Sequence, residues 1–378
     1  MSGPRIPQTD PGAGYRARKA DIDAAVARAL ASGWYILGKE VAAFEAEFAT
    51  YIGVGHAVGV ANGTDALALA LRGLGIGPGD AVATVSHTAV ATVAAIEMAG
   101  ATPVLIDIEE DFFTLDPDEF ERAVAARPAG SPIRAVIPVH LYGQPADLDS
   151  ILAVADQHGI AVIEDCAQAH GAMLNGRRLG SFGVASAYSL YPTKNLAALG
   201  DGGIVTTPDA ELAARIAALR QYGWRNRYVS DFAGVNSRLD ELQAALLRVR
   251  LRHLDEDNQR RQTVAAIYDS GLAQCKGQGL TLPARRPGSS HVFHQYVVRT
   301  EDRDGLQQRL LADGIGTNVH YPLPVHLQPA YRDRIATGPG GLPRSERAAR
   351  SVLSLPMFAQ LTDEQANEVC LAVRRRVA

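Results

Sequence analysis

Short apolar runs alternate with amphipathic segments through the first two thirds of the chain. The runs predict buried strands at residues 56–60, 81–84, 103–107, 133–139, 160–163, 184–188 and 202–207. Between them, segments such as 41–51 repeat apolar residues at helical spacing. Strands that alternate with helices favour a mostly parallel sheet with helices on both faces. The predicted fold class is therefore α/β.

The last third of the chain has a different pattern. Residues 274–290 are rich in Gly and Pro, which indicates a linker or an edge segment. The pattern then predicts a small α+β unit, with strands at 291–300 and 317–321 and helices at 303–313 and 362–376. One long helix before residue 261, apolar first and then strongly charged, is expected to connect the two parts. We therefore predict a large domain at residues 1–252 and a small domain at residues 253–378.

Composition narrows the class of protein. The chain has 378 residues and is 47% hydrophobic, enough for a substantial core and two domains. A net charge of -4 does not indicate the positive charge that binding to nucleic acid or a membrane surface requires. Three cysteines without paired spacing favour free thiols in a reducing compartment. No apolar run has the length of a membrane span, and the amino terminus lacks the apolar segment of a signal peptide. We expect a soluble cytoplasmic protein that binds neither nucleic acid nor membranes.

Lys194 lies on a short connection between two predicted strands. Ser189 precedes it, Pro192 restricts the backbone beside it, and the Gly-rich segment 200–203 allows close backbone approach. Most lysines are solvated surface charges. A lysine withdrawn from water has a lowered pKa and a free amine that can form a Schiff base. The neighbours of Lys194 favour this second interpretation.

An acidic residue supplies the expected partner. Asp165 follows the apolar strand 160–163, and the carboxyl ends of strands border the crevice in which α/β sheets bind ligands. Pyridoxal phosphate (PLP) requires an aspartate facing its pyridine nitrogen. Alone, Asp165 could simply cap a turn. Together with Lys194 it indicates a PLP site.

A phosphate-bearing cofactor also needs an anion site. The turn at residues 62–65 joins a strand to an Ala- and Leu-rich helix, so unpaired N–H groups and the helix dipole face the turn. The turn could be an ordinary N-cap, but with PLP expected we assign Gly63, Thr64 and Asp65 to the phosphate. No Gly-x-Gly-x-x-Gly follows the first strand, which disfavours a nicotinamide cofactor. No His/Cys cluster has metal-ligand spacing, so no metal is expected.

Three motifs resemble those of the DegT/DnrJ/StrS-type sugar aminotransferases: NGTDA at 62–66, EDCAQAHG at 164–171 and SLYPTKN at 189–195. The resemblance extends from residue 33 to residue 358. It implies a PLP enzyme of fold type I, the aspartate-aminotransferase fold, which acts as a homodimer with shared active sites. Lys194 would hold PLP as a Schiff base and move a proton as general base and then acid. Asp165 would keep the ring nitrogen protonated.

The resemblance also implies cofactor contacts for other residues. Gln168 would lie near the ring hydroxyl, and Ser189 would bind the phosphate together with Thr64. After the strand at 81–84 comes the segment Ser86-His87-Thr88-Ala89. In the family an aromatic residue normally follows the threonine that matches Thr88 and stacks on the ring, but this chain has Ala89 there. Either His87 covers the ring instead, or His87 is a core histidine held by hydrogen bonds.

Five further residues belong to the region of the substrate or the partner subunit. Asn236 matches an asparagine that reaches the neighbouring subunit's cofactor phosphate in the family; it could also be the N-cap of the helix that follows, and both can hold. Tyr35 lies in a loop that is near the substrate in the family. His320, Tyr321 and His326 match a segment at the substrate mouth. For Tyr35, His320, Tyr321 and His326 the alternative is that the side chain serves packing alone.

The expected reaction moves an amino group from an amino acid, with L-glutamate favoured by the resemblance, to a nucleotide-linked 3- or 4-keto-deoxysugar for amino-sugar biosynthesis. One alternative is a keto-cyclitol aminotransferase that uses glutamine. Another, of a different class, is a non-catalytic PLP-binding regulator, which the intact Lys194 and Asp165 and the lack of a DNA-binding appendage disfavour. Family members that dehydrate sugars replace the lysine with histidine, so Lys194 opposes that reaction. The sequence leaves the sugar, the carbon, its stereochemistry, the donor and the pathway open.

Overall fold

The computed structural model describes residues 3–127 and 131–377. Its α-helices are α1 (Pro11–Ala17), α2 (Lys19–Ala31), α3 (Lys39–Ile52), α4 (Gly63–Gly73), α5 (Val90–Met98), α6 (Pro117–Ala126), α7 (Leu148–His158), α8 (Ala210–Leu219), α9 (Glu241–Leu251), α10 (Leu254–Gly271), α11 (Arg303–Ala312), α12 (Pro343–Ser351) and α13 (Asp363–Val377). Its strands are β1 (His56–Val60), β2 (Ala81–Val85), β3 (Thr102–Ile106), β4 (Ile133–Ile137), β5 (Ala161–Asp165), β6 (Met173–Leu174), β7 (Arg177–Arg178), β8 (Ala185–Ser189), β9 (Gly203–Thr207), β10 (Trp224–Asn226), β11 (Val229–Ser230), β12 (Ser289–Ser290), β13 (Tyr296–Arg299), β14 (Ala336–Thr337) and β15 (Val352–Leu355).

The central sheet has the strand order β1-β9-β8-β5-β4-β2-β3-β14. β9 is antiparallel to both of its neighbours, whereas the neighbouring pairs from β8 to β14 are parallel. All five residues of β2 are buried, as expected for a strand covered on both faces. The expectation of an α/β fold with a mostly parallel sheet is confirmed, and the carboxyl ends of β2, β4, β5 and β8 meet at one edge of the sheet.

Helix α4 packs tightly against the antiparallel end of the sheet. A Cβ at Gly203 would lie 2.2 Å from the backbone oxygen of Asn62, so only glycine allows this approach. The Asn62 side chain accepts a hydrogen bond from the Asp65 N–H at 2.8 Å and caps the helix. The first turn of α4 is therefore fixed beside the end of β8, where Ser189 lies.

The carboxyl-terminal third differs from its expected pattern in two places. Residues 291–295 are not part of a strand, because Val292 N–H and Gln295 N–H donate to backbone oxygens of the loop at 142–143; β13 begins only at Tyr296. The expected strand at 317–321 is reduced to one bridge between Asn318 and Ser354. Prolines at 322 and 324 cannot donate to a ladder, and the segment instead runs to the edge of the sheet.

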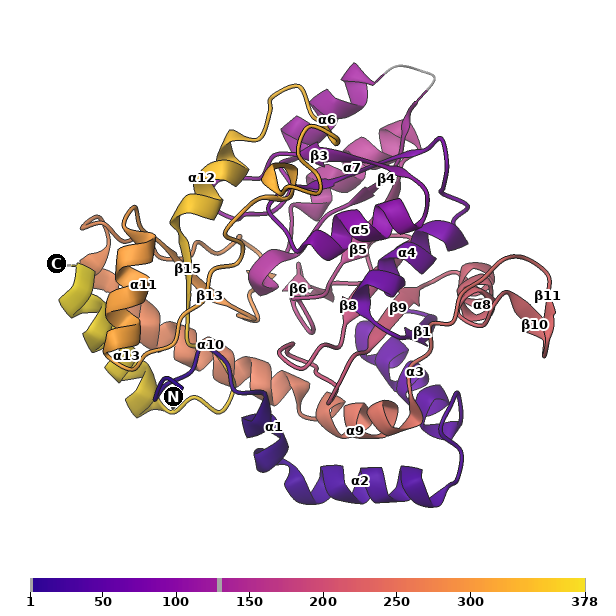
Figure 1. Cartoon of the computed structure of the whole chain (residues 1–378), viewed down its shortest axis with the longest axis horizontal. Coiled ribbons are helices and arrows are strands. Elements are labelled where there is room, and N and C mark those ends of the chain that lie inside the picture. Colours follow the sequence, from indigo (N-terminus) through magenta and orange to yellow (C-terminus); the bar gives the residue numbers. More distant parts are fainter. Residues whose placement is uncertain (1–2, 128–130, 378) are drawn as a thin grey trace.

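The long charged helix expected before residue 261 is two helices. α9 ends at Leu251 and α10 starts at Leu254, with a tight turn in which His253 N–H donates to Arg250 O at 3.0 Å. The two helices follow one another across the lower half of Figure 1, above α2. A separate hydrophobic core lies beyond α9 and gathers side chains of α10, α11 and α13. The domain boundary at residue 252 stays a prediction, and two features cross it: Ile6 joins the carboxyl-terminal core, and β14 pairs with β3.

Within the described ranges, no helix is long and apolar enough to cross a membrane. Cys166, Cys275 and Cys370 are buried free thiols.

Candidate active site

A cavity of about 350 Å³ opens at the carboxyl edge of the parallel strands. Its lining comes from segments that follow β1, β2, β4, β5 and β8, together with two segments of the carboxyl-terminal third. The lining residues are Asn62, Gly63, Thr64, Leu67, Thr88, Ala89, Ala91, Thr92, Val139, Asp165, Ala167, Gln168, Ser189, Tyr191, Thr193, Lys194, Asp201, His294, Gln295, His320 and Tyr321. Polar groups from distant parts of the sequence thus converge where α/β sheets commonly bind ligands.

Lys194 enters this cavity from the loop between β8 and β9. The turn is closed by the Lys194 N–H, which donates to Tyr191 O at 2.9 Å. Desolvation lowers the pKa of the Lys194 amine to about 8, and the negative charge of Asp165 opposes the shift. Such an amine is accessible in its neutral, nucleophilic form near neutral pH.

Asp165 ends β5 and faces the same cavity with 5% of its surface exposed. Its Oδ2 accepts a hydrogen bond from Thr92 Oγ1 at 2.9 Å, and its Oδ1 accepts one from Ala167 N–H at 3.1 Å. Burial raises the pKa of the Asp165 carboxyl, while these two hydrogen bonds and the charge of Lys194 oppose the rise. The carboxylate is therefore held in a fixed orientation beside the cationic group that it compensates.

The first turn of α4 forms the opposite end of the cavity. Asn62 already accepts from the N–H groups of Asp65 and Ala66, so the N–H groups of Gly63 and Thr64 remain at the helix start. A Cβ at Gly63 would lie 2.7 Å from Ser189 Cβ, which places the Ser189 hydroxyl against this turn. Two free N–H groups, two hydroxyls and a helix start make a suitable phosphate site.

Asp65 lies in that turn but outside the cavity lining. Its Oδ2 accepts a hydrogen bond from Ser237 Oγ at 2.6 Å, which ties α4 to the segment before α9. Asp65 thus supports the turn through its backbone N–H and through this hydrogen bond from Ser237.

Gln168 forms a side wall of the cavity and joins its two halves. Its Oε1 accepts a hydrogen bond from Tyr142 N–H at 2.8 Å, and its Nε2 donates to Tyr321 Oη at 3.1 Å. Burial and the nearby charge of Asp165 raise the pKa of Tyr321 to about 12, so its hydroxyl keeps its proton. Because Gln168 uses the oxygen of Tyr321 as acceptor, that proton is available to a ligand in the cavity.

His87 does not line the cavity. It is fully buried, and its Nε2 lies 2.9 Å from Tyr142 Oη. Tyr142 Oη donates to His320 O, so His87 Nε2 is the donor in this pair. Burial lowers the pKa of His87 to about 4, and the residue is a neutral core histidine at neutral pH. The structure places His87 in the core and not in the cavity lining, with its Nε2 hydrogen-bonded and its Nδ1 without a partner among the described residues, whereas Ala89 lines the cavity.

Two of the four predicted substrate residues reach the cavity. His320 and Tyr321 line it, whereas His326 and Tyr35 do not. His326 instead joins Ser86 Oγ at 2.7 Å, which locks the Pro-rich loop to the end of β2. Tyr35 lies on the surface, with 50% of its area exposed, and its hydroxyl donates to Leu30 O.

Asn236 is also outside the cavity of its own subunit. It is exposed and forms one bridge with Gln221. The interpretation of Asn236 as an N-cap is wrong, because α9 begins at Glu241 with Asp240 at its N-cap. The side chain is therefore not needed within its own helix.

Several lining residues were not predicted from the sequence. Thr92 orients Asp165, and His294 and Gln295 contribute polar groups from the segment that was expected to be a strand. Burial and the charge of Lys194 lower the pKa of His294 well below its ordinary value, so a neutral imidazole faces the cavity. Only the excess of polar residues at 291–295 could have signalled a lining role.

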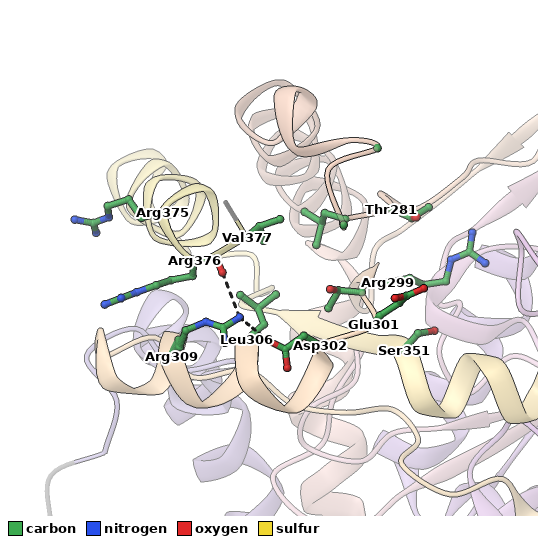
Figure 2. A pocket seen from close by; sticks show the side chains of 14 residues that line it. Thr281, Arg299, Glu301, Asp302, Leu306, Arg309, Ser351, Arg375, Arg376 and Val377 are labelled. Carbon is green, nitrogen blue, oxygen red and sulfur yellow. Dashed lines mark hydrogen bonds and ion pairs between the residues drawn. The ribbon is translucent and has the colours of Figure 1, made fainter.

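Figure 2 shows a larger cavity of about 780 Å³ that shares no lining residue with the strand-end cavity. It lies between α11, the end of α13 and the segment 277–281. Its Arg309 pairs with Asp302 at 2.9 Å and donates to Arg376 O at 3.2 Å. Neither Lys194 nor Asp165 is near this cavity, so the candidate active site is the strand-end cavity.

The DegT/DnrJ/EryC1/StrS aminotransferase family model matches residues 16–374. The chain belongs to this family. A relative from Streptomyces venezuelae, dTDP-3-amino-3,4,6-trideoxy-alpha-D-glucose transaminase, is 53% identical over 371 residues, which cover 98% of this chain and 96% of the relative. A second relative, UDP-N-acetyl-3-dehydro-alpha-D-glucosamine 3-aminotransferase from Acidithiobacillus ferrooxidans, is 43% identical over 370 residues, or 98% of this chain and 97% of its own.

Solved structures agree with this assignment. The crystal structure of S. venezuelae DesV in complex with a ketimine intermediate superposes with a TM-score of 0.94 at 52% identity, covering 99% of both chains. NtdA from Bacillus subtilis, solved with bound cofactor PMP, has a TM-score of 0.87 at 29% identity and covers 96% of this chain and 82% of its own. The expected family and fold type are confirmed.

The displaced pKa of Lys194 can be measured in the cofactor-free protein. The chain has four lysines, so trace acetylation at a series of pH values followed by peptide mapping resolves each amine. We expect Lys194 to titrate near its pKa of about 8, well below the ordinary 10.5. Because the charge of Asp165 favours the protonated amine, Asp165→Asn should lower the pKa of Lys194 further.

Exposed Lys19 is the internal control, because its hydrogen bond to Asp23 raises its pKa and keeps it protonated over the same range. An ordinary titration midpoint for Lys194, or a rise in Asp165→Asn, would contradict this description of the site.

Proposed function

We propose that this protein is a PLP-dependent aminotransferase that transfers an amino group from an amino acid, with L-glutamate as the preferred donor, to carbon 3 of a nucleotide-linked keto-deoxysugar. The observation that carries the proposal is the joint presence of a desolvated lysine amine, a buried aspartate and a helix start in one cavity. Membership of an aminotransferase family supports the reaction class.

The residues of the cavity fit the cofactor. The start of α4 and the hydroxyls of Thr64 and Ser189 would hold its phosphate, and Asp165 would face its ring nitrogen. Lys194 would hold it covalently, and Gln168 and Tyr321 supply a polar wall. PLP, when bound, supplies an electron-withdrawing ring and a carbonyl carbon that carries the amino group from donor to acceptor.

Lys194 is suited to the proton transfers. An amine with a pKa of about 8 can take a proton from the donor's α-carbon and deliver it to the carbonyl-derived carbon that receives the amino group, because both of its forms are accessible at neutral pH. Asp165 is restrained by Thr92 and Ala167 on both oxygens, so its negative charge stays in place during the reaction. The neutral side chains of His294 and His320 add no competing positive charge.

The choice of carbon 3 rests on the relatives. Both name a sugar aminated at carbon 3, one linked to dTDP and the other to UDP. The higher identity of the dTDP-sugar relative favours dTDP, at 53% against 43%. The alternatives are a keto-cyclitol acceptor with glutamine as donor, and a regulator without activity.

We further propose a homodimer in which Asn236 completes the partner's site. Asn236 is exposed, and so are three large apolar or aromatic residues of the same segment of the chain, Tyr228, Val229 and Val235. The hairpin β10–β11 that carries two of them projects from the body of the molecule on the right of Figure 1. Exposed apolar groups of this kind are typical of a subunit interface. A cytoplasmic location also stays a proposal, supported by the three free thiols.

The reaction is tested most simply in the reverse direction. Purified protein with PLP and 2-oxoglutarate should convert dTDP-3-amino-3,4,6-trideoxyglucose and form glutamate. A dTDP-4-amino sugar should be a poor amino donor, and scyllo-inosamine should not react. Asp165→Asn should lose roughly 10²-fold or more in turnover, whereas exposed Asp156→Asn on α7 should not change it.

Faster turnover of the amino-cyclitol would establish the alternative acceptor. No turnover of any amino donor, together with a visible cofactor band that L-glutamate does not shift, would establish the regulator.

The shared site is tested by mixing subunits. Removing one charge-assisted hydrogen bond to the phosphate with Asn236→Ala should cost about 1.5–3 kcal/mol of cofactor affinity. Inactive Lys194→Ala subunits mixed with Asn236→Ala subunits form heterodimers in which one site carries both defects and the other neither. Activity at limiting PLP should therefore rise after subunit exchange.

Thr64→Ala serves as the matched control, because Thr64 and Lys194 line the same cavity of one subunit. Mixing Thr64→Ala with Lys194→Ala leaves every site with a defect, so no activity should return. An active monomer, or no regain with Asn236→Ala despite exchange, would show that sites are not shared through this residue.

A further inference from the structure

A second, much smaller cavity of about 60 Å³ lies behind the loop that carries Lys194. Thr193 and Lys194 line both this cavity and the strand-end cavity, so the loop separates the two. The small cavity forms where four parts of the chain meet: the segment at 9–18, the loop at 192–197, the α9–α10 junction at 250–261 and the segment at 358–360.

Two arginines that line this cavity, Arg250 and Arg18, each have guanidinium nitrogens that lack a partner, although Arg18 Nη2 pairs with Glu256 at 3.0 Å. Arg250 Nη1 donates to Ala197 O at 2.6 Å, but its Nε and Nη2 are buried without a partner among the described residues. Arg18 Nε is likewise buried without a partner among the described residues. A buried charged donor left without an acceptor costs considerably more than a neutral one, so three such nitrogens beside one cavity indicate a missing acceptor.

The carboxylates nearby do not supply that acceptor. Asp10 accepts from Ala13 N–H at 3.1 Å and pairs with Arg16 at 2.5 Å. Asp257 lies 3.5 Å from Arg18 and forms no ion pair with Arg250. Asp10 is thus taken by other donors, and Asp257 lies at ion-pair distance from Arg18 and not from Arg250.

Positive charge predominates around the cavity. Its lining has three arginines, Arg18, Arg250 and Arg261, against the two carboxylates Asp10 and Asp257, and Arg18 also pairs with Glu256 outside the lining. Burial lowers the pKa values of Arg250 and Arg261, with only Asp257 opposing. A water molecule would satisfy N–H groups but would leave this charge uncompensated.

We propose that this cavity binds one small monovalent anion, chloride or a carboxylate of formate size, between Arg250 and Arg18. The volume admits one ion or a pair of waters and excludes sugars, nucleotides and amino acids. The site lies outside the proposed cofactor contacts and does not depend on the identity of the sugar. The anion would join the amino-terminal segment, the Lys194 loop and the start of α10, and would thereby hold the loop in place.

The anion is located directly in crystals of the holoenzyme. Crystals transferred into sodium bromide should show an anomalous bromine peak within hydrogen-bond distance of Arg250 Nε and Nη2. A matched set in sodium formate should show planar density there if carboxylates are also accepted. Density for water alone in both sets would overturn the proposal.

The same site should be visible in solution. At constant ionic strength, replacing sodium gluconate with sodium chloride should raise the unfolding midpoint of the holoenzyme by roughly 2 °C or more, because gluconate is too large to enter. Arg250→Gln should lose this chloride dependence. Arg252→Gln, two residues further on and exposed, is the matched control and should keep it.

A chloride effect that persists unchanged in Arg250→Gln would place the ion elsewhere and refute the assignment. If Arg250→Gln does not fold, the bromide crystals of the natural protein still decide the question. Stabilisation by formate but not by chloride would identify a carboxylate as the occupant.

Discussion

The proposed chemistry depends on one interaction, that of the Lys194 amine with Asp165 in the strand-end cavity. A pKa lowered from 10.5 to about 8 means that keeping the amine protonated costs on the order of 3 kcal/mol. Without Asp165 the cost would be greater, because that carboxylate is the group that opposes the shift. The site therefore keeps the lysine both reactive and able to carry a proton.

Strand β5 explains how two adjacent carboxylates can have different roles. Glu164 faces away from the cavity, where burial alone would raise its pKa, but hydrogen bonds from His140 and from backbone N–H groups hold the pKa below its ordinary value. These donors include Gly180 N–H at 2.8 Å and Gly183 N–H at 2.9 Å, so Glu164 anchors the turn before β8. Asp165 faces the cavity with fewer donors and keeps its charge available. The alternation of side chains along the strand thus separates a carboxylate that holds the fold from one that lines the cavity.

Much of this could be predicted from the sequence where the signal is local. The strand at 56–60 has the predicted bounds, and the parallel strands and the helix start at Asn62 follow from apolar runs and a capping residue. Lys194 and Asp165 were found because each lies where a strand ends. Residues that act through tertiary contacts could not be found this way: Thr92 orients Asp165 from the helix after another strand, and His294 reaches the cavity only because its segment bonds to the loop at 142–143. The prediction of a strand at 317–321 was wrong for a similar reason. Pairing there depends on β15, which meets this segment only at Asn318.

Reductive labelling can show whether Lys194 alone holds the cofactor, as proposed. The protein is reconstituted with PLP, reduced with borohydride and digested, and the pyridoxyl group is located among the four lysine-containing peptides. We expect stoichiometric label on Lys194, and no label in protein first incubated with L-glutamate, since the donor releases the lysine before reduction. Label on Lys19, Lys39 or Lys276, with Lys194 unmodified, would contradict it.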